Sequence, residues 1–600
     1  MPPSLSLDRI LSRHPRCLLL LLVLASTWVV VSGGLLSDDA VPFGDGEHYA
    51  LRALSLYGFL HAGHGHAFWD ELTSPSQSLL PPHDLLFFLV PNALASVALY
   101  GLLKTLVTAA LLAVALFLLC HELERPAWSP ALFLLCVMQN VTLDSSYFYF
   151  ADTPFMAVVA LSLAFQIRAW CRPDWRNALL SGLGAALPFW IKPANALLYL
   201  AIFLVAELVR LFLEKNPDLR LRALGLAGFL PVALAALLCG GFPSIVYLVD
   251  ANETSGIFVT YLQCTGLLRL CYFPLCLTFF YHTQLLLLLA VIAAVILVFR
   301  QRPGLPAFDF SPFPAHLLVP LLLAFGLFGL YFSFGMVEKE MRSLLIILPV
   351  FWLGLFWLLD RWRVRSPVLF LVAMAYSACA AAQVSGDLFG ANSSNSGDYQ
   401  LRDDLLTRFP PPHSVNPAGA ALTRTLLSLI AQNVPVGGKI AVGTEQMYLT
   451  SESLTWIERR DSALSGQPAA YDFANFLTNQ GKVSRPALLR SSAILLILAP
   501  AFQYSPQVQS TSASLAQFAY QKWMLQDHTA KVVPIMFGND TVLGVLIVPH
   551  EPLTDPLITQ AISATGVPEL VDTLSFSGYQ PRRLSLRECL DILLHRPSKP

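Results

Sequence analysis

Acidic and histidine side chains crowd the stretch between residues 35 and 84. The set comprises Asp38, Asp39, Asp45, Glu47, His48, His61, His64, His66, Asp70, Glu71 and His83. Further along, Asp152, Lys192 and the group Lys339, Glu340 and Arg342 stand at the edges of strongly apolar runs. A carboxylate can take a proton from an attacking hydroxyl, and Lys or Arg can hold the charge of a leaving phosphate. Together these residue types would suit the transfer of a group from a lipid-phosphate donor.

The composition shows in which environment such chemistry would take place. Of the 600 residues, 55% are hydrophobic and 13% are charged, and the mean hydropathy is +0.59. A soluble globular chain carries about 25% charged residues. The net charge of −1 argues against a nucleic-acid partner, which requires a dense cationic face. The composition therefore predicts a polytopic membrane protein in contact with membrane lipids.

About eleven apolar runs approach the length of about 20 residues that crosses a bilayer. They cover residues 17–34, 95–119, 129–147, 152–168, 177–191, 193–212, 223–247, 273–299, 315–335, 343–360 and 366–385. The two runs around Lys192 allow a second interpretation, in which they form one long broken helix. That interpretation would reverse the topology of everything downstream.

The basic residues indicate which side each loop faces. With the N-terminus in the cytoplasm, the cytoplasmic ends receive Arg125, Arg168, Arg172, Arg176, Arg210, Lys215, Arg220, Arg222, Arg300, Arg302, Arg361, Arg363 and Arg365. The opposite ends receive only Arg52, Lys192, Arg269, Lys339 and Arg342. This asymmetry follows the positive-inside rule. It predicts that the first loop, about residues 35–84, lies outside together with Asp152, Lys192 and Arg342, where they could share one cavity.

Residues 386–600 have a different character from the apolar part. A polar linker and the stretch Pro410–Pro412 precede short β-type runs at 439–443, 493–498, 531–535 and 542–548, with a helical stretch at 422–432. This alternation predicts a small α/β domain. The expected organisation is a membrane domain over residues 1–385 and an extracytoplasmic α/β domain over residues 386–600.

Five segments, in order, resemble a known family over about residues 17–385. Residues 43–53, FGDGEHYALRA, resemble a first-loop pattern Asp-Glu-x-x-Tyr-x-x-x-Ala, and residues 81–86, PPHDLL, are similar to a following Pro-Pro-Leu segment. Residues 150–156, 182–193 and 340–349 resemble its acidic fourth-span start, its Gly-x-x-x-Gly…Thr-Lys segment and its Arg-Tyr…Pro helix. The family is the protein O-mannosyltransferase-like superfamily of the GT-C fold, which includes bacterial aminoarabinose and lipopolysaccharide-core transferases. Two departures are Gly46, which separates Asp45 from Glu47, and Ser343, which stands where tyrosine is common.

The resemblance implies a GT-C-like glycosyltransferase, a hexosyl or pentosyl transferase that builds a cell-envelope glycan. It would move a sugar from a polyprenyl-phosphate donor to a hydroxyl of a glycan, lipid or protein acceptor, with inversion. The implied catalytic base is Asp45, with Glu47 as the alternative. The implied substrate-binding residues are Asp152, Lys192, Arg342, Tyr49 and His83. The tail resembles those of bacterial relatives, which favours the bacterial plasma membrane over the endoplasmic reticulum.

Each of these residues also has a plainer interpretation. Asp45 and Asp152 could be helix N-caps, and Lys192 and Arg342 could be snorkelling side chains at the interface. No cofactor is certain. A divalent metal ion at Asp152, or at His61, His64 and His66, is the alternative to a metal-free site, although Gly63 and Gly65 favour a solvated loop around these histidines.

Two other functions remain open. One is a non-enzymatic membrane protein such as a transporter of lipid-linked glycans or an assembly factor. The other is a relative that kept the fold and lost catalysis. A transporter is expected to hold ionisable groups near the membrane midplane, often within repeated halves. The acids here cluster in one external loop and no clear repeat is present, which favours the enzyme.

Overall fold

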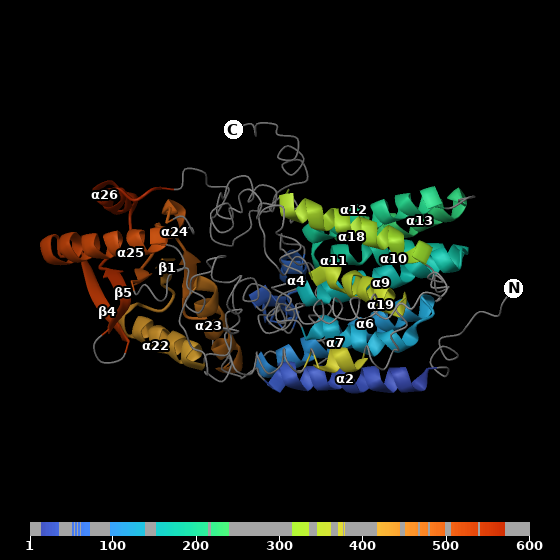
Figure 1. The fold of residues 1–600 in the computed structure, drawn as a ribbon. Helices are drawn as coiled ribbons and strands as arrows, with labels where there is room; N and C mark the ends of the chain where they lie inside the picture. The colour runs from blue at the N-terminus through green and yellow to red at the C-terminus, as the bar shows by residue number, and fades with distance from the viewer. Residues whose placement is uncertain are drawn as a thin grey trace, which may run out of the picture.

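The computed structural model describes two parts of the chain, a helical bundle and an α/β domain (Figure 1). The described residues are 14–34, 51–72 without 53, 57 and 61, 97–138, 152–213, 218–238, 315–334, 345–361, 370–377 without 376, 417–443, 450–465, 469–477, 481–498, 506–537 and 541–569. In the view of Figure 1 the bundle runs from blue to yellow, and the α/β domain is orange to red.

The bundle consists mainly of apolar helices. Its helices are α2 (Pro15–Gly34), α4 (Gly65–Leu72), α6 (Val97–Glu122), α7 (Ser129–Val137), α9 (Asp152–Cys171), α10 (Trp175–Ala186), α11 (Pro188–Ile191), α12 (Pro193–Leu213), α13 (Leu219–Ala236), α18 (Ala315–Phe334) and α19 (Leu348–Arg361). Among the described residues, four helical segments are long and apolar enough to cross a membrane: Leu102–Glu122, Asp152–Cys171, Asn195–Leu213 and Leu219–Ala236. The predicted helical part, with helices suited to crossing a membrane, is therefore confirmed.

The number of about eleven spans stays a prediction. The predicted run at 273–299 lies outside the described residues, as do parts of those at 129–147, 223–247 and 366–385. Helix α7 ends at Val137, ten residues before the end of the run at 129–147. Within the run at 343–360, a short turn of 3-10 helix at 345–347 precedes α19.

The direction of the chain around Lys192 follows from side-chain contacts. From α9 to α12, Asp152 contacts Lys192, Ser162 contacts Tyr199 and Gln166 contacts Glu207, so these two helices run in the same direction. From α9 to α10, Arg168 contacts Asn177, whereas Gly184 lies beside Ser162, so these two run in opposite directions. Helices α10 and α12 are thus antiparallel, and the chain reverses at Lys192. The interpretation as one long broken helix is wrong.

Small residues let α10 and α13 pack closely. A Cβ atom at Gly182 would collide with the backbone carbonyl of Gly225, and one at Gly228 would lie 2.7 Å from the carbonyl oxygen of Leu179. Contacts of this type between small residues are common in membrane helix pairs, since they bring the two backbones together. Gly182 of the motif segment 182–193 is therefore a packing residue.

Replacing Gly182 with alanine is expected to lower stability by about 1–3 kcal/mol, because the added methyl group overpacks the α10–α13 contact. Thermal unfolding of the purified chain in detergent would measure this change. The matched control is Gly326→Ala in α18, where a Cβ atom meets nothing within 4 Å. Equal unfolding midpoints for the two variants would contradict the assignment.

The tail forms a mixed five-stranded sheet covered by helices. Its strands are β1 (Lys439–Gly443), β2 (Asp472–Asn475), β3 (Ala493–Ile497), β4 (Ala530–Phe537) and β5 (Thr541–Pro549), in the order β2-β1-β3-β5-β4. Strands β2, β1 and β3 are parallel, and β5 is antiparallel to β3 and β4. The helices are α22 (Pro417–Asn433), α23 (Ser451–Ser465), α24 (Arg485–Leu488), α25 (Pro506–Phe518) and α26 (Asp555–Thr565). The predicted α/β character is confirmed.

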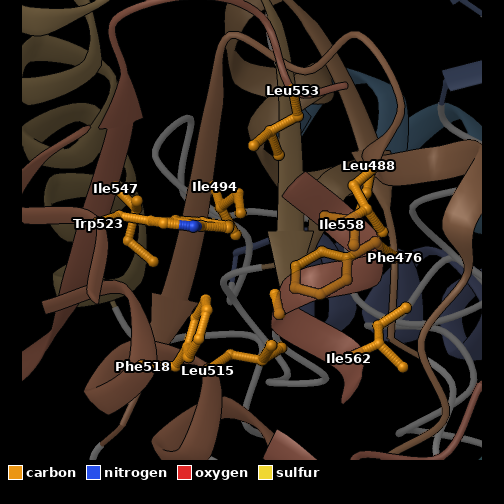
Figure 2. Close-up of a pocket in the computed structure, with 11 residues that line it drawn as sticks. Phe476, Leu488, Ile494, Leu515, Phe518, Trp523, Ile547, Leu553, Ile558 and Ile562 are labelled. Carbon is orange, nitrogen blue, oxygen red and sulfur yellow. The ribbon is translucent and has the colours of Figure 1, made fainter. Parts of the chain in front are cut away.

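The two faces of this sheet build two separate apolar cores. Along β3, Ile494 and Leu496 belong to one core, and Ala493, Leu495 and Ile497 belong to the other. The first core leaves a small gap of about 10 Å³, about the room that one water molecule needs. Figure 2 shows its apolar lining, with Trp523, Phe518 and Phe476 around it. This gap is too small and too apolar to be a substrate site.

An arginine ties α26 to the rest of the α/β domain. The guanidinium of Arg485 donates from Nε and Nη2 to both carboxylate oxygens of Glu569, at 2.6 and 2.9 Å, and from Nη1 to Asp555 of α26 at 2.9 Å. The hydrogen bonds from Arg485 hold the pKa of Glu569 below its usual range.

We expect Arg485→Gln to lower the free energy of unfolding of α26 by about 1 kcal/mol at neutral pH, since the pair is partly exposed. A depressed carboxyl pKa contributes stability above the unfolded-state pKa and loses it as the pH falls through the folded-state value. The difference between variant and wild type should therefore disappear in acid. Hydrogen exchange of α26 in the full chain from pH 7 to pH 3 would measure it, and a difference independent of pH would contradict the assignment.

Candidate functional site

One end of the bundle is rich in arginine, and we call it the Glu122 end. The Glu122 side chain is 1% exposed and pairs with Arg168 of α9 at 3.5 Å and with Arg172 at 3.2 Å. Near the same end, Arg222 of α13 pairs with Glu207 of α12. Basic residues that the sequence analysis assigned to one side of the membrane thus lie together.

A line of hydrogen bonds joins α9 to α12 inside the bundle. The Tyr199 hydroxyl donates to Ser162 Oγ at 2.8 Å. Gln166 Nε2 and Trp170 Nε1 both donate to Glu207 Oε1, at 2.9 and 2.8 Å. Polar groups away from water need such partners, so this line fixes the two helices against each other.

The opposite end of α9 holds a buried ion pair. Lys192 Nζ lies 2.8 Å from Asp152 Oδ1, and the side chains are 10% and 3% exposed. Asp152 is the first residue of α9, and Lys192 is the extended residue between α11 and α12. The ammonium group of Lys192 therefore points into the protein, and the snorkelling interpretation is wrong for it. We call this the Asp152 end.

The other residues of the expected site lie outside the described residues. These are Asp45, Glu47, Tyr49, His83 and Arg342. The structure brings Asp152 and Lys192 together, and the functional roles of all seven residues remain predictions.

The histidine segment has the loop that the glycines suggested. Gly63 has a φ of +70°, a conformation that glycine adopts without strain, and it lies in a turn before α4. Gly65 instead begins α4, so His66 is helical and His64 is not. Where the structure describes the chain, no three His, Cys, Asp or Glu side chains are grouped to hold a metal ion, and His61 lies outside that part.

The α/β domain contacts the segment that follows the acidic motif. Arg459 Nη1 of α23 donates to Ser55 Oγ at 3.2 Å. Trp456 and Ile457, also of α23, belong to the same buried core as Leu54 and the bundle helices. In Figure 1, α23 is the helix of the tail that faces the bundle, and α4 lies between them. The tail is thus in contact with the first loop.

Sequence reasoning missed Lys104. This residue of α6 is 2% exposed, and the buried Thr105 and Thr108 lie close by in the helix. The available signal was a basic residue inside an apolar run, which is a functional candidate by default at membrane depth. Lys104 lies inside the run at 95–119, whereas the candidate residues stand in the first loop or at the edges of such runs.

Comparisons with known proteins give a distant likeness to a solved structure. No protein-family model matches the chain, and no curated protein matches it. The crystal structure of ArnT from Cupriavidus metallidurans bound to undecaprenyl phosphate is similar to this chain at a TM-score of 0.48 and 13% sequence identity, over 88% of this chain and 97% of that one. At this level of similarity, a proposal about function depends on the residues of the chain itself.

Proposed function

We propose that this protein is a membrane glycosyltransferase that moves a sugar from a polyprenyl-phosphate donor to an acceptor hydroxyl on the extracytoplasmic face, with inversion. The observation that carries the proposal is the buried pair of Lys192 and Asp152 at the end of the bundle opposite the arginine-rich Glu122 end. Two charges away from water have a desolvation cost of several kcal/mol each. A pair retained there, in helices that could cross a membrane, marks a functional site by default.

The proposed reaction has a defined route for each atom. Asp45, with Glu47 as the alternative, accepts the proton of the acceptor hydroxyl while the hydroxyl oxygen attacks the anomeric carbon. The bond from that carbon to the phosphate oxygen breaks, and polyprenyl phosphate leaves with the electron pair. Lys192 and Arg342 hold the negative charge on the leaving phosphate.

The ion pair suits Lys192 for this role. An ammonium group has three N–H donors, and the bond to Asp152 Oδ1 at 2.8 Å takes one of them. Asp152 is then a positioning residue, which holds Lys192 in one orientation and leaves its remaining donors for the phosphate. By the family resemblance, Tyr49 and His83 supply further contacts with the substrate.

A transfer assay tests the proposal. Purified protein would receive a panel of polyprenyl-phosphate hexoses and pentoses, with membrane extract as the source of acceptor. We expect one donor to be consumed with release of polyprenyl phosphate, and Lys192→Gln to slow this release. The control is Lys522→Gln in the tail, whose pair with Asp527 is partly exposed. A folded protein that consumes none of the donors would contradict the proposal that it is a glycosyltransferase.

The same preparation tests the rival function. The line of hydrogen bonds between α9 and α12 includes Glu207, an ionisable group within an apolar helix, and such groups also occur in transporters. Movement of a lipid-linked sugar across vesicles without its consumption would favour the transporter over the transferase. A bound donor that is neither consumed nor moved would favour a relative without catalysis.

A further inference from the structure

Lys104 has no role in the reaction as described so far. It belongs to the part of α6 that starts at Leu102 and has the composition of a membrane span. The residue is 2% exposed. A lysine at this depth must be solvated by other polar groups of the protein, so the question is which groups it faces.

The packing of α6 on α9 shows which residues of α9 lie at the same height along the bundle axis as Lys104. The two helices pack along much of their length, and both C-terminal ends meet where Glu122 contacts Arg168 and Arg172. They therefore run in the same direction. Lys104 precedes Glu122 by 18 residues, about five helical turns and about 27 Å, so both side chains leave the same face of α6.

Counting 18 residues back along α9 from Cys171, as from Glu122 to Lys104 on α6, reaches Thr153. Cys171 faces α6, because its Sγ contacts the carbonyl oxygen of Glu122 at 3.6 Å. Thr153 precedes Cys171 by 18 residues, again about five turns, so it faces α6 at the level of Lys104. Residues 104 and 153 thus lie opposite each other, beside Asp152 and its partner Lys192.

The hydroxyl of Thr153 is a second, independent indication that a ligand binds beside Lys104. The residue is 1% exposed, and its hydroxyl has no hydrogen-bond partner among the described residues. A buried hydroxyl left in this state destabilises the protein, and a bound acceptor oxygen would satisfy it. Lys104 lies across from Thr153, and Lys192 is paired with the neighbouring Asp152. Both lysines are buried, and ammonium groups are the kind of group that binds an anion.

We infer that Lys104 and Thr153 complete, with Lys192, a binding site for the phosphate group of the lipid donor. This inference rests on the proposed function and adds two residues to it. The phosphate lies between α6, α9 and the start of α12, receives hydrogen bonds from both lysines and from the threonine, and leaves Asp152 to orient Lys192.

Direct binding of farnesyl phosphate to the purified full chain in detergent tests the site without any transfer step. We expect Lys104→Gln to weaken binding about tenfold or more, the loss of a hydrogen bond to a charged group. Thr153→Val should weaken it about threefold to tenfold. The matched control is Thr108→Val, buried about one turn further along α6, which should bind as the wild type does.

Two further ligands and the wild-type result distinguish a failure of this inference from a failure of the proposed function. Farnesol and inorganic phosphate show whether the phosphate group is recognised on a lipid or by itself. Wild-type binding that Lys104→Gln leaves unchanged would overturn the inference and leave the proposed function standing. A wild type that binds no farnesyl phosphate would overturn both.

A further variant covers the case in which Lys104→Gln does not fold. Histidine gains its charge below about pH 6.5, so Lys104→His should approach wild-type affinity as the pH falls from 8 to 5.5. The measured quantity is the ratio of its affinity to that of the wild type, since the phosphate itself titrates in this range. A ratio that does not change with pH would overturn the inference.

Discussion

Replacing Asp152 with asparagine is expected to destabilise the protein by about 3–5 kcal/mol, the typical effect of removing one partner of a buried ion pair. The Lys192 side chain is 10% exposed, and its Nζ lies 2.8 Å from the carboxylate oxygen that the substitution removes. The ammonium group would therefore stay buried beside a neutral amide. This is a large part of the total stability of a domain, about 5–15 kcal/mol. The unfolding midpoint of the purified chain in detergent would fall by several degrees or more.

A second variant distinguishes stability from function. Asp152→Asn combined with Lys192→Gln removes both charges and should recover most of the lost stability, but its transfer activity should stay low because the phosphate has lost a cation. The control is Asp527→Asn in the tail, whose pair with Lys522 is partly exposed, and it should change stability by about 1 kcal/mol or less. Wild-type stability of the single variant Asp152→Asn would show that the pair is not buried as described.

Replacing Asp45 with asparagine should lower the rate of sugar transfer about 10²- to 10⁴-fold, the usual contribution of a general base. Asparagine keeps the shape of the side chain and cannot accept the proton of the acceptor hydroxyl at neutral pH. The release of polyprenyl phosphate from the donor would be the measured rate. Binding of farnesyl phosphate should be unchanged, since Asp45 is assigned to the acceptor side of the reaction.

Glu47→Gln is the matched variant for this assignment. If Asp45 is the base, Glu47→Gln should keep its rate within about tenfold of the wild type, below the contribution of a general base. A large loss in Glu47→Gln together with wild-type activity in Asp45→Asn would move the base role to Glu47. Full activity in both variants would remove the base role from this motif.

Local sequence determined the kinds of element that this chain forms. Hydrocarbon excludes charged groups, so an uninterrupted apolar run identifies a candidate membrane helix by itself, as the stretch from Leu102 to Glu122 shows. Short β-type runs bounded by polar residues likewise predicted β1, β3, β4 and β5. Strand β2, Asp472–Asn475, was missed because it is a short edge strand that begins and ends with a polar residue and has no continuous apolar run.

Charge distribution along the sequence also predicted the two-sided arrangement of the bundle. Arg168, Arg172 and Arg222 lie toward the Glu122 end, and Lys192 lies at the other end of α9. The length of a helix is enough to predict this arrangement, because the rise per residue keeps the residues at its two ends on opposite sides of the bundle.

Only the tertiary structure decided which polar side chains meet. Asp152 and Lys192 are 40 residues apart in sequence, and no local pattern shows that α9 and α12 run in the same direction or that the chain reverses between α11 and α12. The level of Lys104 opposite Thr153 likewise depends on how α6 packs against α9. Apolar periodicity is weak in helices that are hydrophobic on all sides, so the sequence does not indicate which face of a span turns inward. Packing between helices makes that choice, and with it the partners of every buried charge.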